Sequence, residues 1–268
     1  KDLFEGDTGT LRGWGMTTRG AVCDFAAAGG GGSISPAPTA SAPSFAIAPV
    51  EERLADALAR RLTILGACAS ACRGSAKLSV SGKAARSLGL TKRRSSRPVS
   101  IGKGSGRRPS AGQLRYRIGL TKRARAALRD EKRVTAALSV LVAVDGGPDV
   151  KLKSSVRLRS TAGLGSVARN GLRVRAACSR TCPFEAGLYL SPRTARKLGL
   201  KAKGSKTIRV ASRRASVSTR GRELKLKMAR STRAAAARQK RMSLTLRAVA
   251  GASSAPTRKA SRTLTLRR

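Results

Sequence analysis

The chain has 268 residues, enough for two domains that each bury a core, with 40% apolar residues but only 3% aromatic ones. It contains 57 Lys and Arg against 13 Asp and Glu, a net charge of +44, and no histidine. Without histidine, the chain supplies neither a Ser-His-Asp triad nor a Cys-His pair. No apolar run approaches the roughly 18 residues that cross a bilayer. The longest candidate, Val134–Val144, has the length of a buried strand.

The charge is concentrated beyond residue 50. Four of the 13 acids and three of the 57 bases lie in residues 1–25, and residues 26–50 carry no charge. The remaining nine acids and 54 bases give the rest of the chain a net charge of +45. Such a surface attracts polyanions, namely nucleic acid, anionic cell-wall polymer or acidic lipid headgroups. The alternative is that the bases only coat a solvated surface.

Residues 1–25 hold the most specific motif. Gly6-Asp7-Thr8-Gly9 predicts a tight turn, because Asp and Thr bond the local backbone and Gly accepts a positive φ. Thr10, Leu11 and Trp14 lead into a strand. A hairpin of this size is only marginally stable alone, so we expect it to belong to a larger sheet.

This string resembles the closing motif of the P/Homo B domain, the jelly-roll that follows the catalytic domain of kexin- and furin-like subtilisin proteases. The positions that match are Asp2, Gly6, Asp7, Thr8, Gly9, Thr10, Leu11 and Trp14, whereas Thr18 stands where an apolar residue is usual. The resemblance implies that residues 1–25 are the C-terminal remnant of a P domain in a secreted serine endopeptidase. It also implies a catalytic domain upstream in cis, and Asp2 and Asp7 as calcium candidates. We therefore expect the chain to be a fragment.

Residues 26–50 are uncharged and rich in Ala, Gly, Ser and Pro, which predicts a linker.

Beyond the linker, one module of about 110 residues occurs twice. Leu54–Leu62 aligns with Leu164–Leu172, and Ala85–Leu90 aligns with Ala195–Leu200, both at an offset of 110. Arg125 and Arg133 match Arg233 and Arg241 at an offset of 108. We place module 1 at residues 51–160 and module 2 at residues 161–268.

Apolar and polar residues alternate in short runs of both modules, such as Leu114–Ile118 and Leu172–Arg175, which predicts six or seven strands per module and a two-sheet sandwich. Two short helices are predicted in each copy. The first covers Lys83–Leu88 and Arg193–Leu198, closed by Gly89 and Gly199. The second covers Thr121–Arg129 and Ser231–Gln239, with Thr121 or Ser231 as the cap. The glycine-rich run Gly102–Arg108 lacks the spacing of a phosphate-binding loop and is interpreted as a flexible basic connection.

A Cys-x-x-x-Cys pair marks each module, Cys68 with Cys72 and Cys178 with Cys182. Each pair lies between predicted strands, where a short turn brings the Cα atoms within disulfide range. Zinc ligation is disfavoured because the spacing is one residue too long and histidine is absent. Redox catalysis uses Cys-x-x-Cys at a helix N-terminus. We predict two disulfides and an oxidising compartment, and Cys23 remains without an assigned partner.

The repeated pattern resembles the Arg-rich Ig-like or fibronectin-type-III-like repeats in tails of secreted actinobacterial proteins. The predicted fold class is all-β, a truncated jelly-roll end plus two tandem Ig-like β-sandwich modules with short helices. The predicted function is a secreted or cell-surface, non-catalytic C-terminal portion of a P-domain protein, with no membrane span and no cofactor beyond calcium in an intact P domain. Two alternatives stay open, a tail that binds anionic cell-wall or surface polymers and non-specific nucleic-acid binding. Few aromatics and no nucleic-acid motif disfavour the second.

Overall fold

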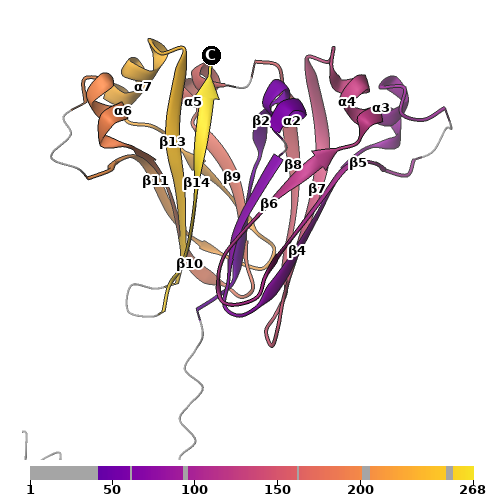
Figure 1. Ribbon diagram of the computed structural model, residues 1–268, viewed down its shortest axis with the longest axis horizontal. Helices are drawn as coiled ribbons and strands as arrows, with labels where there is room; N and C mark the ends of the chain where they lie inside the picture. Colours follow the sequence, from indigo (N-terminus) through magenta and orange to yellow (C-terminus); the bar gives the residue numbers. More distant parts are fainter. Residues whose placement is uncertain (1–41, 61, 93–95, 162, 201–205, 252–255) are drawn as a thin grey trace, which may run out of the picture. The chain divides into compact units, whose positions relative to one another are not determined.

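The alternating runs of both modules form strands in the computed structural model (Figure 1). The structure describes residues 42–268 except 61, 93–95, 162, 201–205 and 252–255. The first 41 residues, which hold the P-domain motif, Cys23 and most of the predicted linker, lie outside the described residues.

The described residues of module 1, together with the strand directly before it, form eight strands and three helices. In chain order these are β1 (Phe45–Pro49), β2 (Glu51–Arg53), α2 (Leu54–Arg60), β3 (Leu62–Cys68), β4 (Cys72–Val80), α3 (Gly82–Ser87), β5 (Val99–Arg108), β6 (Gly112–Leu120), α4 (Lys122–Leu128), β7 (Arg133–Val144) and β8 (Val150–Arg159).

Module 2 repeats this order of elements from α2 onward. Its described elements are α5 (Leu164–Asn170), β9 (Leu172–Cys178), β10 (Cys182–Leu190), α6 (Pro192–Lys197), β11 (Ile208–Val217), β12 (Arg222–Leu226), α7 (Arg230–Ala237), β13 (Arg241–Ala250) and β14 (Arg258–Arg267).

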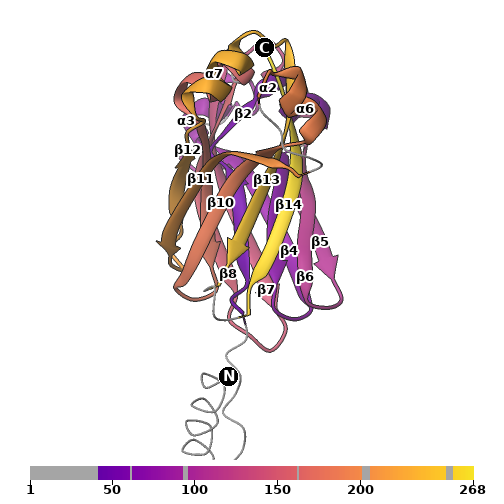
Figure 2. The same ribbon diagram turned by 90° about the vertical axis from the view of Figure 1, so that its left-hand side faces the viewer.

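Each module is a β-sandwich. In module 1, β3 and β6 form one layer and β5-β4-β7-β8-β2 the other, and only two residue pairs join β5 to β6 at the corner. In module 2, β12 and β9 face the sheet β11-β10-β13-β14 (Figure 2). The two layers of each module enclose a separate apolar cluster. The predicted all-β sandwich fold is therefore confirmed for the described residues.

The two modules share one strand. β1 pairs antiparallel with β3 of module 1 on one edge and with β9 of module 2 on the other. Phe45 is thus opposite both Ala67 and Cys178. Through β1, the strands of both layers of module 1 and strands β9 and β12 of module 2 form one continuous ten-stranded sheet.

The side chains of β1 alternate between the two cores, as the period of two in a strand requires. Phe45 and Ile47 belong to the apolar cluster of module 2, whereas Ala46 and Ala48 belong to that of module 1. The Phe45 ring meets Phe184 edge-on, with centroids 5.2 Å apart. β1 is buried on both faces, which explains its uninterrupted apolar sequence Phe-Ala-Ile-Ala-Pro.

The predicted linker boundary at residue 50 is wrong. Residues 45–49 are a fully buried strand, and the lack of charge there reflects burial rather than a solvated connection. Composition does not distinguish a buried strand from a solvated linker here. A strand that packs between two cores and a linker can both be uncharged and rich in Ala and Pro.

The helices gather at one end of the sandwiches, and the tight hairpin connections lie at the other (Figures 1 and 2). Both predicted helix pairs are present within one or two residues, and Gly89 and Gly199 each close a helix at φ 66°. Thr121 caps α4 as predicted, its Oγ1 accepting from the backbone N–H of Ala124 at 3.1 Å. The Ser231 cap is wrong: α7 begins at Arg230, so Ser231 lies inside its first turn. α2 and α5 were not predicted, although both lie in the repeated Leu54–Leu62 and Leu164–Leu172 segments.

The shared strand predicts that truncating Phe45 destabilises the described unit as a whole. We expect Phe45→Ala to lower the free energy of unfolding by about 3–5 kcal/mol, because it opens a cavity between β1 and the core of module 2. Urea unfolding of the full chain measures the loss. Leu141→Ala, at a side chain that is 38% exposed, is the control and should change the free energy by about 0.5 kcal/mol or less. A loss below 1 kcal/mol for Phe45→Ala, on the same scale, would show that β1 is peripheral.

Candidate functional site

Both predicted disulfides are present and buried. The Cα atoms of Cys68 and Cys72 are 6.3 Å apart, and those of Cys178 and Cys182 are 6.4 Å apart. Both separations fall inside the range of about 4.4–6.8 Å found for disulfides. All four residues are at most 2% exposed, so the thiols are not presented for redox exchange.

The two disulfide-closed loops meet at Ser44, directly before β1. The N–H of Ala69, inside the first loop, donates to Ser44 Oγ at 2.8 Å. The N–H of Ser179, inside the second loop, donates to the Ser44 carbonyl at 2.9 Å, and the Ser44 N–H donates to Ser179 Oγ at 3.2 Å. The disulfides thus fix the two loops that hold the start of β1. Their role is structural.

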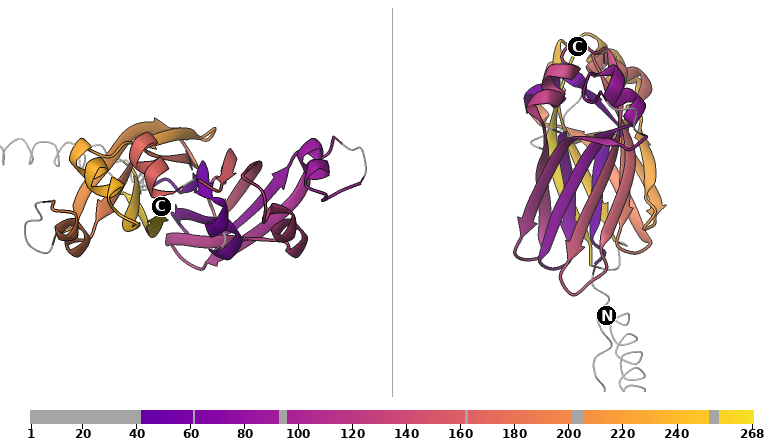
Figure 3. Two further views of the ribbon diagram at one scale, coloured as in Figure 1. Left: turned by 90° about the horizontal axis from the view of Figure 1, so that it is seen from above. Right: turned by 90° about the vertical axis from the view of Figure 1, so that its right-hand side faces the viewer.

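In module 1, β5, β4, β7 and β8 lie side by side in one layer (Figure 3, right), and their outer side carries a continuous set of exposed bases. Side chains directly opposite one another in antiparallel strands point to the same face. We call this surface the lysine face, and its exposed basic members are Arg73, Lys77, Lys103, Arg107, Arg133, Lys151, Lys153 and Arg157.

The bases of the lysine face are separated only by small or uncharged residues. The register places Lys103, Lys77, Ser139 and Lys153 in one row across the four strands. Neighbouring strands are about 4.8 Å apart, so this row presents three ammonium groups along roughly 14 Å. No outward residue of the four strands is acidic, and none of the eight bases forms a salt bridge within the described part of the chain. At the edge of the surface, Glu51 of the neighbouring β2 lies opposite Arg157 and pairs with Arg159 of β8.

This arrangement costs stability. Lys77 is directly opposite Lys103, and Arg73 is directly opposite Arg107. Like charges at opposed positions repel each other. A bound polyanion would remove that repulsion, so the lysine face is electrostatically suited to one.

The glycines of this region serve the core. Gly102–Arg108 is part of strand β5 and not the flexible connection expected from the sequence. A Cβ on Gly74 would lie 2.6 Å from Tyr116 Cε1, and a Cβ on Gly106 would lie 2.8 Å from Tyr116 Cβ. Glycine therefore makes room for the buried Tyr116 ring, while the alternate residues Lys103 and Arg107 point outward.

The matching surface of module 2 pairs part of its positive charge with a carboxylate. Glu185 stands at the position of Ser75, and its carboxylate accepts from Arg214 Nε at 2.7 Å and from Arg209 Nη1 at 3.4 Å. Arg247 lies over the Tyr189 ring at 4.4 Å. Corresponding surfaces of the duplicated modules thus differ, because module 2 pairs two arginines with a carboxylate at the position where module 1 has Ser75.

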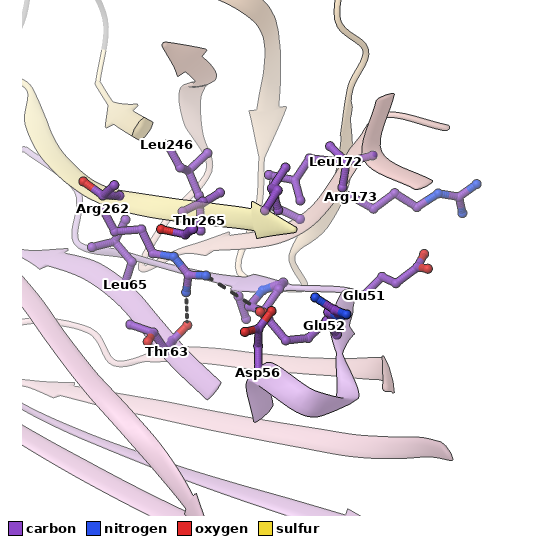
Figure 4. A pocket seen from close by; sticks show the side chains of 18 of the residues that line it. Glu51, Glu52, Asp56, Thr63, Leu65, Leu172, Arg173, Leu246, Arg262 and Thr265 are labelled. Carbon is purple, nitrogen blue, oxygen red and sulfur yellow. Dashed lines mark hydrogen bonds and ion pairs between the residues drawn. The ribbon is translucent and has the colours of Figure 1, made fainter. Parts of the chain in front are cut away.

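A cleft of about 670 Å³ opens between the modules, where β1 leaves β3 (Figure 4). Arg262 of β14 reaches into this cleft, and its Nη1 donates to the Thr63 carbonyl at 2.7 Å. Its Nη2 lies 3.9 Å from Glu52 Oε2. Arg262 therefore satisfies the backbone of β3 where β1 no longer covers it, and it connects module 2 to both β2 and β3 of module 1.

Burial is the main influence on titration in the cleft. It raises the pKa of the Glu52 carboxyl, against the lowering effect of Arg262, and nearby Asp56 raises it as well. Burial likewise lowers the pKa of Arg262, opposed by Glu52. The side chains of Glu52 and Arg262 are 23% and 12% exposed. This pair joins the two modules, and the cations Arg115 and Arg173 also line the cleft.

The predicted P-domain residues, including the calcium candidates Asp2 and Asp7, lie outside the described residues. Within the described ranges, no group of three or more His, Cys, Asp or Glu side chains is arranged to hold a metal ion. Among the described helices, none has the length and apolar character needed to cross a bilayer.

No protein-family model matches the chain, and no curated protein matches it. Among solved structures, a tetra-tandem repeat in the extending region of a large adhesion protein is similar, with a TM-score of 0.25 and 10% sequence identity. That match covers 84% of this chain and 49% of the other, so the chain spans about half the length of that structure. A likeness this weak carries no argument about fold or function.

The Glu52 environment predicts a pH dependence of stability. Because its pKa is higher in the folded chain than in the unfolded one, folding takes up a proton between the two values. The Glu52 contribution is therefore complete below pH 4.5 and is lost as the pH rises through the raised pKa. Glu52→Gln should remove this loss, so the difference in unfolding free energy between the two proteins should change with pH over that window. Urea unfolding at several pH values measures it.

Arg262→Gln provides the companion variant. It removes the cation that lowers the pKa of Glu52. The pH range over which the unfolding free energy falls should therefore move to higher pH. If the unfolding free energies of the original chain and of Glu52→Gln changed with pH in the same way, the raised pKa of Glu52 would be contradicted.

Proposed function

We propose that this chain is a secreted, non-catalytic tail that binds anionic polymers of the cell wall or cell surface through the lysine face. The observation that carries the proposal is the outer surface of β5-β4-β7-β8, where no residue is acidic and eight exposed bases form no salt bridge among the described residues. A linear polyanion can follow the cross-strand row of Lys103, Lys77 and Lys153.

The contrast between the modules supports a ligand for this surface over a merely solvated one. Where Glu185 is present in module 2, it takes up Arg209 and Arg214. Module 1 keeps Ser75 at that position, and its register sets like charges opposite each other. The lysine face has no aromatic side chain, which favours a polymer recognised by charge over one recognised by base stacking.

Secretion is supported by the disulfides. Bonds of this kind persist in oxidising compartments, and the buried Cys68–Cys72 and Cys178–Cys182 bridges fix the loops around Ser44.

The P-domain motif favours a parent protein that is a subtilisin-like serine endopeptidase, with the catalytic domain in cis. This proposal is supported by residues 2–17 of the sequence alone. Reading the coding sequence upstream tests it. Jelly-roll strands preceded by Asp, His and Ser catalytic segments are expected there, and a reading frame without them would contradict the protease parent.

Removing the lysine row should weaken polymer binding. For the full chain with Lys77, Lys103 and Lys153 all replaced by Ser, we expect affinity for an immobilised glycerol-phosphate polymer at 50 mM NaCl to fall about tenfold or more. Binding should also depend less on salt. In protein binding to nucleic acid, each lost phosphate contact reduces the slope of log affinity against log salt concentration by about one. Retention at rising salt measures both effects.

The matched control is the replacement of Lys225, Lys227 and Lys259 by Ser, which removes the same charge from exposed positions of module 2. It should weaken binding much less. Equal losses of affinity for both triple variants would show that binding depends on the net charge of the chain and not on the lysine face. Retention that ignores salt, or tighter binding to DNA than to the polymer, would contradict the proposed function.

A further inference from the structure

A hollow of about 420 Å³ lies between α5 and α7, at the helical end of module 2. Its floor is apolar, because Leu164, Ala168 and Ala236 are at most 4% exposed there. The hollow is lined only by residues of module 2 and lies far in the fold from the lysine face of module 1 (Figure 1).

Four arginines line the hollow, and no Asp or Glu does. They are Arg169, Arg230, Arg233 and Arg268. Among the described residues, none of the four forms a salt bridge. Arg169 folds back along α5, and its Nη1 lies 3.8 Å from where a Cβ on Gly165 would be.

The corresponding part of module 1 has neither the floor of small residues nor the arginine-rich rim. At offsets of 110 and 108, Ala168 and Ala236 correspond to Leu58 and Leu128, which pack on the core of module 1. Arg169, Gln239 and Arg268 correspond to Ala59, Glu131 and Ser160. Relative to its duplicate, module 2 therefore has smaller side chains on the floor, two more cationic side chains at the rim and one carboxylate fewer.

We propose that the hollow between α5 and α7 binds a small amphiphilic anion, a carboxylate or phosphate attached to a short alkyl body. Guanidinium groups bind both oxyanions with paired, charge-assisted hydrogen bonds. The alanine and leucine floor offers an apolar seat for the alkyl part. The volume falls in the range of about 300–1,000 Å³ that is usual for small-molecule sites.

The test is calorimetric titration of the full chain with octyl phosphate, octanoate, inorganic phosphate and octanol. If the proposal holds, at least one of the two amphiphilic anions binds about tenfold or more tightly than inorganic phosphate and octanol, and the stronger one identifies the preferred head group. Arg233→Gln should weaken that binding about tenfold, whereas Arg125→Gln, at the corresponding position of module 1, should leave it unchanged.

Two filling variants test the floor. Ala236→Leu restores the module 1 residue and should abolish binding, and Ala234→Leu obstructs the hollow from an exposed position if the first variant does not fold. Inorganic phosphate binding as tightly as octyl phosphate would overturn the proposal, since attraction to charge alone would explain it. Unchanged binding by a folded filling variant would also overturn it. The lysine-row triple variant should bind the amphiphile normally, which separates this inference from the proposed function.

Discussion

Two hydrophobic cores depend on one five-residue strand. Because β1 pairs with β3 and β9 and sends alternate side chains into each core, neither module buries its apolar surface completely without it. Ser44 extends this dependence to both disulfide-closed loops. The contacts of Arg262 with Thr63 and of Gln113 with the backbone of Ser261 add further links between the modules. Residues 41–268 consequently form one compact unit.

Most elements of this unit were predictable, because the alternation of residues reports burial of one strand face, and the duplication supplied each prediction twice. β1 was not predictable as a strand, since burial on both faces erases the alternation and leaves a composition like that of a linker. The lysine face was also missed. Its bases are visible at alternate positions such as Lys103 and Arg107, but the row with Lys77 and Lys153 arises from strand register, which pairs residues far apart in the chain. The disulfides were predictable because a three-residue spacing restricts the geometry locally.

The duplicated modules keep one fold and differ in chemistry. Core positions and helix-closing glycines recur, for example Gly89 and Gly199 with the same φ. Other positions differ, among them exposed strand faces and the helical end, where Ser75 is replaced by Glu185 and Leu128 by Ala236. These positions do not contribute to the shared strand, so they vary without disturbing the joint between the cores.

The position of β1 also determines how the unit bears mechanical load. Tension on the chain that precedes Ser44 acts along the axis of β1, parallel to the strands that flank it. It therefore loads the hydrogen bonds to β3 and β9 together, in shear, and does not open them one at a time. Resistance to pulling is a matter of unfolding rate. A tail attached to a surface by its N-terminal side would carry such tension on two ladders at once, with the disulfide-closed loops bracing the point where force is applied.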